Sequence, residues 1–179
     1  MKGYLVIGPE SSGTRIVTKL LIEAGCKGDA SHFQPFDNES LPPSLTPIVW
    51  RRSVPMGVQL PNLHKMIEEF KGARYEPHII IVSRDIHATA SSQVSHGHSP
   101  DYRTALDNIS IAWSYIFSSI SYLKNPNTRF TIVNYESLVS GRAACNHILE
   151  ILGLSLLTQE QWVTLWITNE NCKWQGETL

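Results

Sequence analysis

Apolar and polar residues follow two kinds of spacing along the chain, and each predicts a different element of secondary structure. Short continuous apolar runs predict strands that are covered on both faces, as in a parallel sheet. Longer stretches with apolar residues three or four positions apart predict amphipathic helices. The predicted strands are residues 4–7, 47–50, 78–83 and 129–133. Helices alternate with these strands, so the pattern predicts an α/β fold with the strand 78–83 at its centre.

The predicted helices each carry apolar residues on one face. They lie within residues 17–24, 63–70, 106–123, 144–152 and 161–167, and Gly25 and Gly153 end the first and the fourth of them. The helix within residues 106–123 is rich in aromatic side chains, Trp113 and Phe117 among them. We interpret these as core packing rather than as a cofactor site. The Pro-rich residues 26–46 predict a long loop over one edge of the functional site.

Length and composition predict a single domain covering residues 1–179. With 179 residues and 42% hydrophobic content, the chain is long enough for one compact core.

A formal net charge of -1 and a pI near 6.6 give no general basic surface for nucleic acid. Without a leader-like segment or an apolar run of ~18 residues, we expect a cytoplasmic protein that does not bind membranes. The three cysteines are widely separated, which predicts reduced thiols and no metal site.

A glycine-rich segment, residues 8–15, lies between the first predicted strand and the helix that follows it. Its backbone N–H groups and the positive end of the helix dipole predict a phosphate-binding loop. The nucleotide-triphosphatase pattern G-x-x-x-x-G-K-[ST] would need lysine where this chain has Thr14, and a metal-binding hydroxyl where it has Arg15. The sequence therefore predicts an anion site that does not need a metal ion.

A second group of candidate residues, Arg84 to Ser92, begins at the carboxyl end of the predicted strand 78–83. Open α/β sheets bind their ligands at this edge. Arg84 offers a forked cation and Ser92 offers a hydroxyl further along the following helix, so together they predict a site for a further phosphate. The alternative is a local ion pair in which Arg84 and Asp85 cap the helix.

Four stretches of the chain resemble motifs of the sulfotransferase family, in the same order as in that family. Together they extend over most of the chain. Residues 11–15 are similar to its 5′-phosphosulfate loop, K-[ST]-G-T-[TRS], and their ending is nearest to the heparan-type branch. Residues 84–92 are similar to the 3′-phosphate motif R-x-x-x-D-x-A-x-S, with Ala88 in place of the aspartate. Residues 135–139 resemble the Y-E-D-L segment, and residues 148–154 resemble the helix end I-L-E-F-L-G-L.

This resemblance implies a three-layer P-loop fold, in which a central, mostly parallel sheet is flanked by helices. It also implies 3′-phosphoadenosine 5′-phosphosulfate (PAPS) as sulfuryl donor and adenosine 3′,5′-bisphosphate (PAP) as product, with no metal required. The donor-binding residues that it implies are Ser11, Ser12, Gly13, Thr14, Arg15, Arg84 and Ser92.

Two departures from the family pattern concern catalysis. The family's loop lysine, which supports the departing phosphate, falls on Ser11, and serine carries no charge. Arg15 could replace that charge, as could Arg51 or Arg52 if their strand lies beside the first strand. The catalytic histidine of cytosolic members falls on Ser53.

Sulfuryl transfer needs a base that takes a proton from the acceptor. The heparan-type branch uses a glutamate in the loop after the first helix, and its position falls on Ala30 here. We predict His32 as the base, with Asp29 as the second choice. His96 and His98 are the next candidates, and their alternative role is an acceptor-lining or flexible loop. Glu136, after the last strand, is expected to cap a helix or to pair with an arginine.

Three functions are open from the sequence. The first is a sulfotransferase-like enzyme that acts on a hydroxyl or amine of an unknown acceptor. The second is a PAP- or PAPS-binding module that lost its chemistry with the loop lysine. The third is a P-loop kinase for a small metabolite, against which the missing lysine and the missing acidic metal ligand argue. The sequence determines neither the acceptor nor the oligomeric state.

Overall fold

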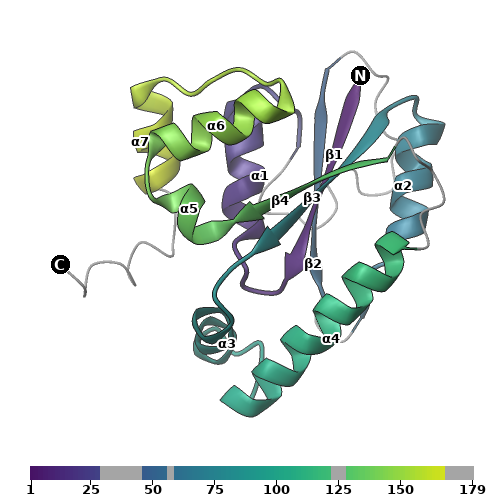
Figure 1. Ribbon diagram of the computed structural model, residues 1–179, viewed down its shortest axis with the longest axis vertical. Helices are drawn as coiled ribbons and strands as arrows, with labels where there is room; N and C mark the ends of the chain where they lie inside the picture. The colour runs from purple at the N-terminus through teal and green to yellow at the C-terminus, as the bar shows by residue number, and fades with distance from the viewer. Residues whose placement is uncertain (29–45, 56–58, 122–127, 168–179) are drawn as a thin grey trace.

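Strands and helices alternate along the chain, as the apolar pattern predicts (Figure 1). The computed structural model describes residues 1–28, 46–55, 59–121 and 128–167. Each predicted strand and helix overlaps one of the observed elements. These are β1 (Lys2–Pro9), α1 (Thr14–Glu23), β2 (Ile48–Val54), α2 (Leu63–Gly72), β3 (Glu76–Ser83), α3 (Ile86–Ser95), α4 (Tyr102–Ser121), β4 (Arg129–Asn134), α5 (Tyr135–Val139), α6 (Arg142–Leu152) and α7 (Gln159–Ile167).

The four described strands form one parallel sheet in the order β2-β1-β3-β4. Tyr4 of β1 pairs with Val49 on one side and with His78 on the other. β4 lies at the far edge, where Thr131 pairs with Ile80 of β3. The predicted central position of residues 78–83 is therefore confirmed. Because all strands run in one direction, their carboxyl ends meet at the edge where parallel α/β sheets bind ligands.

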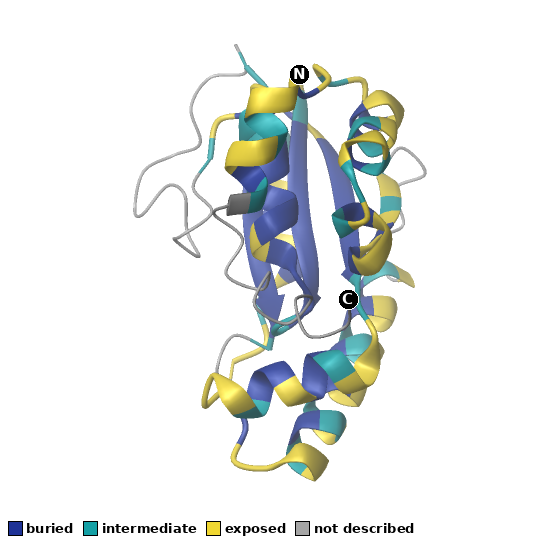
Figure 2. Ribbon diagram, turned by 90° about the vertical axis from the view of Figure 1, so that its left-hand side faces the viewer, coloured by how far each residue is buried: buried dark blue, intermediate teal, exposed yellow. Residues whose placement is uncertain are grey.

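Helices cover both faces of the sheet and give the molecule three layers (Figure 1). α1, α5, α6 and α7 pack on one face, and α2 and α4 pack on the other. Figure 2 shows the sheet buried between them, and only the edge strand β4 is largely exposed. α3 lies beyond the carboxyl ends of the strands. The predicted three-layer α/β fold with a central parallel sheet is thus confirmed.

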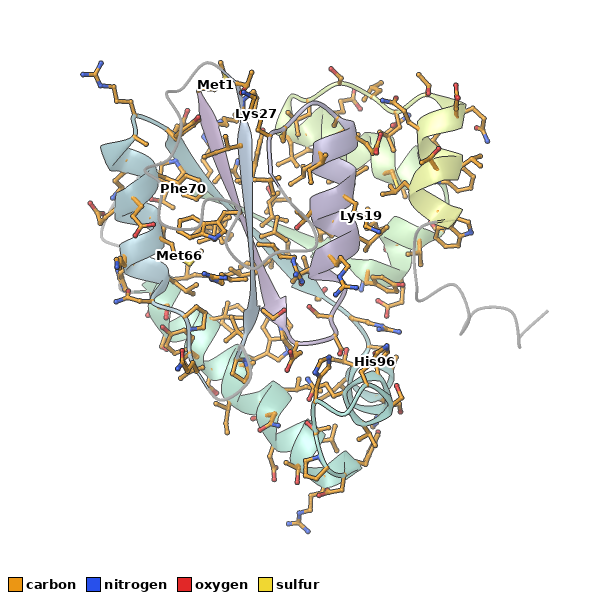
Figure 3. The ribbon with its side chains drawn as sticks, turned by 180° about the vertical axis from the view of Figure 1, so that it is seen from behind. Met1, Lys19, Lys27, Met66, Phe70 and His96 are labelled. Carbon is orange, nitrogen blue, oxygen red and sulfur yellow. The ribbon has the colours of Figure 1, made fainter. Side chains whose placement is uncertain are left out.

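The face of the sheet under α2 is formed by alternate residues of the strands. Leu5 of β1 belongs to one buried cluster with Met66 and Phe70, whose side chains point toward the sheet in Figure 3. Gly3 leaves room for the Phe70 ring, because a Cβ at this position would lie 2.6 Å from it. Trp50 meets the same ring edge-on, with 5.8 Å between ring centroids. β1 supplies side chains to two apolar layers, which explains its continuous apolar run.

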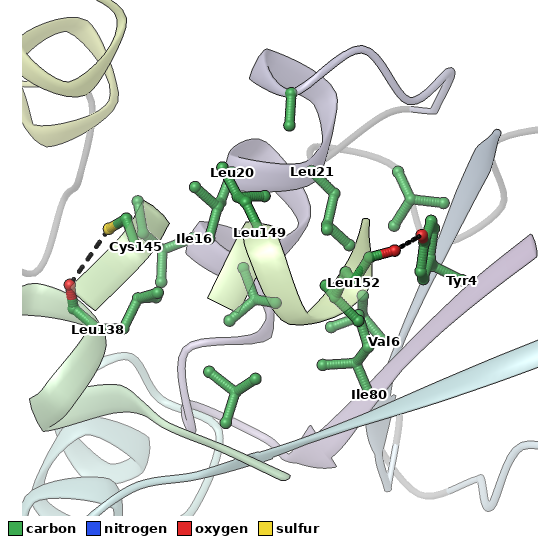
Figure 4. Packing of buried hydrophobic residues seen from close by; sticks show 14 of the residues in the cluster. Tyr4, Val6, Ile16, Leu20, Leu21, Ile80, Leu138, Cys145, Leu149 and Leu152 are labelled. Carbon is green, nitrogen blue, oxygen red and sulfur yellow. Dashed lines mark hydrogen bonds between the residues drawn. The ribbon is translucent and has the colours of Figure 1, made fainter. Parts of the chain in front are cut away.

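The opposite face joins β1 to α1 and α6 (Figure 4). Tyr4 belongs to one buried cluster with Leu21 and Leu149. Its hydroxyl donates a hydrogen bond of 3.1 Å to the carbonyl oxygen of Leu152, so the buried polar tip is satisfied. α6 ends at this point because Gly153 adopts a φ of 70°, the left-handed conformation that ends many helices.

The long helix α4 buries only one stripe of its apolar residues. Ala112 and Ile116 pack in the core under the sheet. Phe117, by contrast, is 54% exposed and stacks on Trp113 with 5.5 Å between ring centroids. The prediction that the aromatic residues of this helix pack in the core is therefore wrong for Phe117. The spacing of apolar residues shows which side of a helix is apolar, but it does not show how much of that side the sheet covers.

β2 continues past the predicted residues 47–50 to Val54 and includes two arginines. Arg51 and Arg52 are both buried, and their backbone pairs with Val6 and Ile7 of β1. The strand persists through these polar residues because its hydrogen bonds depend on the neighbouring backbone. It therefore carries two cations to the carboxyl end of the sheet.

His78 is a buried polar residue of the central strand β3. Its Nε2 atom lies 2.9 Å from the hydroxyl oxygen of Thr131. Burial, and after it the charges of Lys2 and Arg129, lower the pKa of His78 from 6.5 to about 4. Between these two pH values the unfolded chain binds a proton that the folded protein does not, so the free energy of unfolding rises with pH in this window.

We expect the free energy of unfolding to fall by about 1.5 kcal/mol from about pH 6.5 to about pH 5 on account of His78. The His78→Gln variant keeps a hydrogen-bonding side chain that does not titrate, so it should lose this part of the pH dependence. Urea unfolding at the two pH values measures the difference. The same loss of stability in both proteins would show that His78 is not its source.

Candidate functional site

The loop between β1 and α1 has a backbone geometry that suits an anion. Ser11 and Gly13 both have positive φ angles, 67° and 98°. Gly13 directly precedes α1, and its carbonyl oxygen accepts a hydrogen bond of 3.1 Å from the N–H of Ile16. No side chain caps α1 at Gly13, so the first N–H groups of the helix and its positive dipole end face the loop. This geometry supports the predicted phosphate-binding role.

Two glycines of the loop lie against backbone and ring atoms of neighbouring elements. A Cβ at Gly8 would lie 2.6 Å from the carbonyl oxygen of Val82, and a Cβ at Gly13 would lie 2.3 Å from the ring of Tyr135. The end of β3 and the start of α5 therefore fix the loop. The hydroxyl of Ser12 is buried and has no hydrogen-bond partner among the described residues. Such buried unpaired groups are rare in native structures, and a bound ion is one of their explanations.

Arg84 follows β3 directly and reaches across to the loop. Its Nη1 atom donates a hydrogen bond of 3.0 Å to the carbonyl oxygen of Ser11, and its guanidinium carbon lies 4.7 Å from the centre of the Tyr135 ring. Asp85 instead caps α3, where its Oδ1 atom accepts from the N–H of Ala88 at 2.8 Å. No ion pair joins Arg84 to Asp85 among the described residues. Asp85 thus caps the helix, as the alternative predicted, but it does not form the ion pair with Arg84 that the alternative also predicted.

A chain of amide and hydroxyl groups fastens α3 and α4 to the loop. Gln93 of α3 donates a hydrogen bond of 2.9 Å to the carbonyl oxygen of Glu10. Ser99 donates to the side-chain oxygen of Gln93 at 3.1 Å, and Asn108 of α4 donates to the hydroxyl of Ser99 at 3.1 Å. Gln93 and Ser99 are buried, and hydrogen bonds between buried groups hold their partners in one arrangement. The position of the loop is thus coupled to both helices.

Ser92, the second predicted ligand of the further phosphate, lies beside this chain of hydrogen bonds. It is buried on α3, and its hydroxyl oxygen is 3.4 Å from the Nδ1 atom of His96. Arg84 donates a hydrogen bond to the loop itself, whereas on α3 it is Gln93, the neighbour of Ser92, that donates one. The structure therefore brings both residues to the same end of the sheet without a contact between them.

Glu136 joins the ends of β3 and β4. One of its carboxylate oxygens accepts from the backbone N–H of Asp85 at 2.9 Å, and the other accepts from the side-chain amide of Asn134 at 2.8 Å. Asn134 caps α5 by accepting from the N–H of Ser137. The hydrogen bond from Asp85 supports the predicted role at a helix cap, because Asp85 is the residue that caps α3. Parallel pairing of Ser83 with Asn134 brings the two strand ends within reach of Glu136.

Three arginines lie on the elements that flank the loop. Arg15 is exposed on α1, whereas Arg51 and Arg52 are buried in β2, which does lie beside β1. The guanidinium carbon of Arg52 is 5.7 Å from the centre of the Trp50 ring. Ser53, which stands where cytosolic sulfotransferases have their histidine, pairs with Gly8 at the start of the loop. Two of the three arginines therefore lie on the strand next to β1, which leads into the loop.

Glu10 is a loop residue that none of the sequence motifs singles out. Its backbone N–H donates to the carbonyl oxygen of Val54 at 3.2 Å. The Oε1 atom of its mostly buried side chain lies 3.7 Å from the Nδ1 atom of His98. Burial raises the pKa of Glu10, against the opposing effect of the charges of His98 and Arg51. The available signal was its place as the one acidic residue of the glycine-rich segment 8–15.

The two predicted bases, His32 and Asp29, lie in residues 29–45, outside the described part of the chain, as does the polar tail from residue 168. In the parts of the chain that are described, no three His, Cys, Asp or Glu side chains gather where a metal ion could be held. Over the same residues, no helix combines the length and the apolar character needed to cross a membrane.

Comparisons with known proteins show a likeness in fold. No protein-family model matches the chain, and no curated protein matches its sequence. Among solved structures, the chain is similar to a retinol dehydratase in complex with androsterone and the inactive cofactor PAP, with a TM-score of 0.53 and 14% sequence identity. The two share their fold. The likeness covers 92% of this chain, which spans 64% of the retinol dehydratase chain.

Proposed function

We propose that the protein is a sulfotransferase-like enzyme that transfers a sulfuryl group from PAPS to a hydroxyl or amine of an acceptor. The observation that carries this proposal is the hydrogen bond from Arg84 to the carbonyl oxygen of Ser11, because it joins the two predicted phosphate sites at one edge of the sheet. The likeness to a structure that holds PAP adds support. At 14% identity, that likeness by itself concerns only the fold.

Residues of two segments bind the donor in this proposal. The loop residues 11–15 hold the 5′-phosphosulfate, with the buried Ser12 hydroxyl and the N–H groups at the uncapped start of α1 as donors. Arg84 and Ser92 hold the 3′-phosphate. The Nε atom of Arg84 is buried and has no hydrogen-bond partner among the described residues, so this side chain still has a donor for an anion. These groups fit a bisphosphate nucleotide.

Catalysis requires charge stabilisation at the loop and a proton acceptor opposite it. The loop N–H groups stabilise the negative charge that develops on the departing phosphate. Arg15, Arg51 or Arg52 supplies the positive charge that Ser11 lacks. The candidates from the sequence for the group that takes the proton of the acceptor are His32 and Asp29, in the segment after α1. The acceptor itself is not specified by these residues.

Binding of PAP to the purified protein tests the donor site, and calorimetry is the measurement. We expect binding without magnesium ions, and we expect Ser92→Ala to weaken it by about 10-fold, since one hydrogen bond to an anion is lost. Ser91→Ala, at the neighbouring exposed position of α3, is the matched control and should bind like the wild type. Binding of ATP only in the presence of magnesium, with no binding of PAP, would exclude the proposal.

Ser11 favours one second candidate, a module that binds PAP or PAPS without catalysis. Its uncharged side chain stands at the position of the family's loop lysine and removes a group that acts on the departing phosphate. Single-turnover reactions with radiolabelled PAPS and a panel of phenols, alcohols and amines separate the two functions. Transfer of label to any acceptor supports the enzyme, and tight binding of PAP without transfer supports the module.

A further inference from the structure

Glu10 and His98 form a carboxylate–imidazole pair next to the loop, and the proposed function does not yet use it. We infer that His98 accepts the proton of the attacking hydroxyl or amine and that Glu10 orients its imidazole for this step. The inference rests on the proposed function, because it needs a sulfuryl donor bound at the neighbouring loop. It assigns the base to described residues in place of His32 or Asp29.

The carboxylate of Glu10 is held in place by its backbone. The N–H of Glu10 donates to Val54 at the end of β2, and its carbonyl oxygen accepts from the buried Gln93 of α3. Its side chain is only 15% exposed. Since Ser11 follows directly, the carboxylate lies at the start of the segment that holds the phosphosulfate in the proposed function.

The ring of His98 is positioned by the turn between α3 and α4. The N–H groups of His98 and Ser99 both donate to the carbonyl oxygen of Gln93, at 2.8 and 3.3 Å. The ring stacks on His96, with 6.0 Å between centroids and an angle of 12° between planes. His96 is labelled in Figure 3, and its Nδ1 atom is 2.8 Å from the carbonyl oxygen of Ser92. The His96 ring thus contacts the backbone of α3, whereas the His98 ring lies next to Glu10 of the loop.

The orientation of the His98 ring suits a proton acceptor. Its Nδ1 atom faces Oε1 of Glu10 at 3.7 Å. In the proposed step, the neutral ring carries its proton on Nδ1 beside the carboxylate, so Nε2 keeps its lone pair, and this is the tautomer of a general base. Nε2 makes no hydrogen bond among the described residues, and the side chain is 42% exposed. An acceptor molecule can therefore reach it, and contacts of this kind are often longer before substrate binds.

Burial and the neighbouring charges act in opposite directions on the ionisation of Glu10. Two groups near Glu10 favour its ionised form, the buried Arg51 of β2 and His98 when its ring is protonated. Burial favours the neutral form and is the larger effect, so the pKa of Glu10 is raised. An ionised Glu10 stabilises the imidazolium that forms when His98 takes a proton. In the proposed step, the negative charge of Glu10 therefore compensates the positive charge that His98 gains with the proton.

In the proposed step, the acceptor oxygen or nitrogen forms a bond to sulfur while its proton moves to Nε2 of His98. The bond between sulfur and the bridging oxygen breaks, and its electron pair stays on that oxygen, so PAP leaves as an anion. His98 becomes an imidazolium beside the Glu10 carboxylate and later returns the proton to solvent. No oxidant, reductant or metal takes part in this balance.

Single-turnover transfer from radiolabelled PAPS to the acceptor panel tests the role of His98. We expect His98→Gln to lower the rate about 100-fold while the affinity for PAP stays within about 3-fold of the wild type. We expect Glu10→Gln to lower the rate about 10-fold, because the imidazolium loses its carboxylate partner. His64→Gln, at an exposed position of α2, is the control and should keep the wild-type rate.

NMR of the imidazole groups tests the pair without any turnover. The His98→Gln variant assigns the His98 signals, and the neutral ring is expected to carry its proton on Nδ1. In Glu10→Gln, the fraction of neutral rings with the proton on Nδ1 should fall, because the carboxylate beside Nδ1 is gone. An unchanged tautomer in Glu10→Gln would show that the two side chains are not coupled and would overturn the inference.

The outcomes separate this inference from the proposed function. If the wild type does not bind PAP, the proposed function fails, and the role of His98 as its base fails with it. If the wild type binds PAP and transfers label, but His98→Gln transfers at the same rate, only the inference fails. If the wild type binds PAP and transfers label to no acceptor, the donor site stands and the proton-acceptor role is overturned.

Discussion

Replacing Arg84 with alanine is expected to weaken the binding of PAP about 100-fold, a larger effect on binding than that of any other substitution proposed for this protein. The arginine is proposed to bind the 3′-phosphate, and its Nη1 atom also supports the loop through the carbonyl oxygen of Ser11. Its removal therefore takes away one phosphate ligand and loosens the other phosphate site. Calorimetry with PAP, at constant salt concentration, measures the change.

Two further variants show which property of Arg84 matters. Arg84→Lys keeps the charge but loses the planar fork that lies over the Tyr135 ring, so we expect an intermediate loss of about 10-fold. Arg142→Ala removes an exposed arginine at the start of α6 and controls for net charge. Wild-type affinity in Arg84→Ala, with the variant fully folded, would contradict the assignment of the 3′-phosphate to this residue.

The change of Gly13 to alanine is expected to lower the free energy of unfolding by about 3 kcal/mol, the largest expected effect on stability. Two causes add together. Gly13 has a φ of 98°, which L-residues rarely adopt, and its new Cβ would lie 2.3 Å from the Tyr135 ring. For a chain of this size, the midpoint of thermal unfolding should fall by roughly 6–12 °C. Displacement of Tyr135 should also disturb Arg84 and weaken PAP binding.

Two other glycines separate these causes. Gly25 has a φ of 101° but no atom within 4 Å of the position that a Cβ would take, so Gly25→Ala should show only the backbone cost of about 1 kcal/mol. Gly72, at the end of α2, also has open space and has no positive φ, so Gly72→Ala should be neutral or slightly stabilising. Equal losses in Gly13→Ala and Gly25→Ala would show that the contact with Tyr135 does not constrain the loop.

The strands and helices could be predicted because the spacing of their apolar residues differs between a buried strand and an amphipathic helix. The run from Ile79 to Val82 is apolar at every position since both faces of β3 are covered. Gly153 ends α6 as predicted, because this is a local backbone property. Phe117 shows the limit of such reasoning. Its spacing fits an apolar face, but its exposure depends on how far the sheet extends beneath α4.

The candidate site could be predicted only where a local pattern carries it. Ser12 and Gly13 lie in a glycine-rich turn at the end of a strand, and Arg84 lies at the end of the next strand in the sheet. Glu10 was missed because no pattern distinguishes it, and its importance depends on His98, which is distant in sequence and reaches it only through the packing of α3. His32 and Asp29 remain predictions.

By itself the sequence determined an α/β fold, a loop suited to phosphate after the first strand, and a cation with a hydroxyl after the third. These are local properties, since backbone conformation and apolar period are set by residues a few positions apart. Only the tertiary structure decided that Arg84 binds the Ser11 carbonyl rather than Asp85, that Arg51 and Arg52 are buried in the strand beside β1, and that Glu10 faces His98. Those contacts join segments far apart in the chain, which the order of parallel strands and the packing of helices bring to one edge.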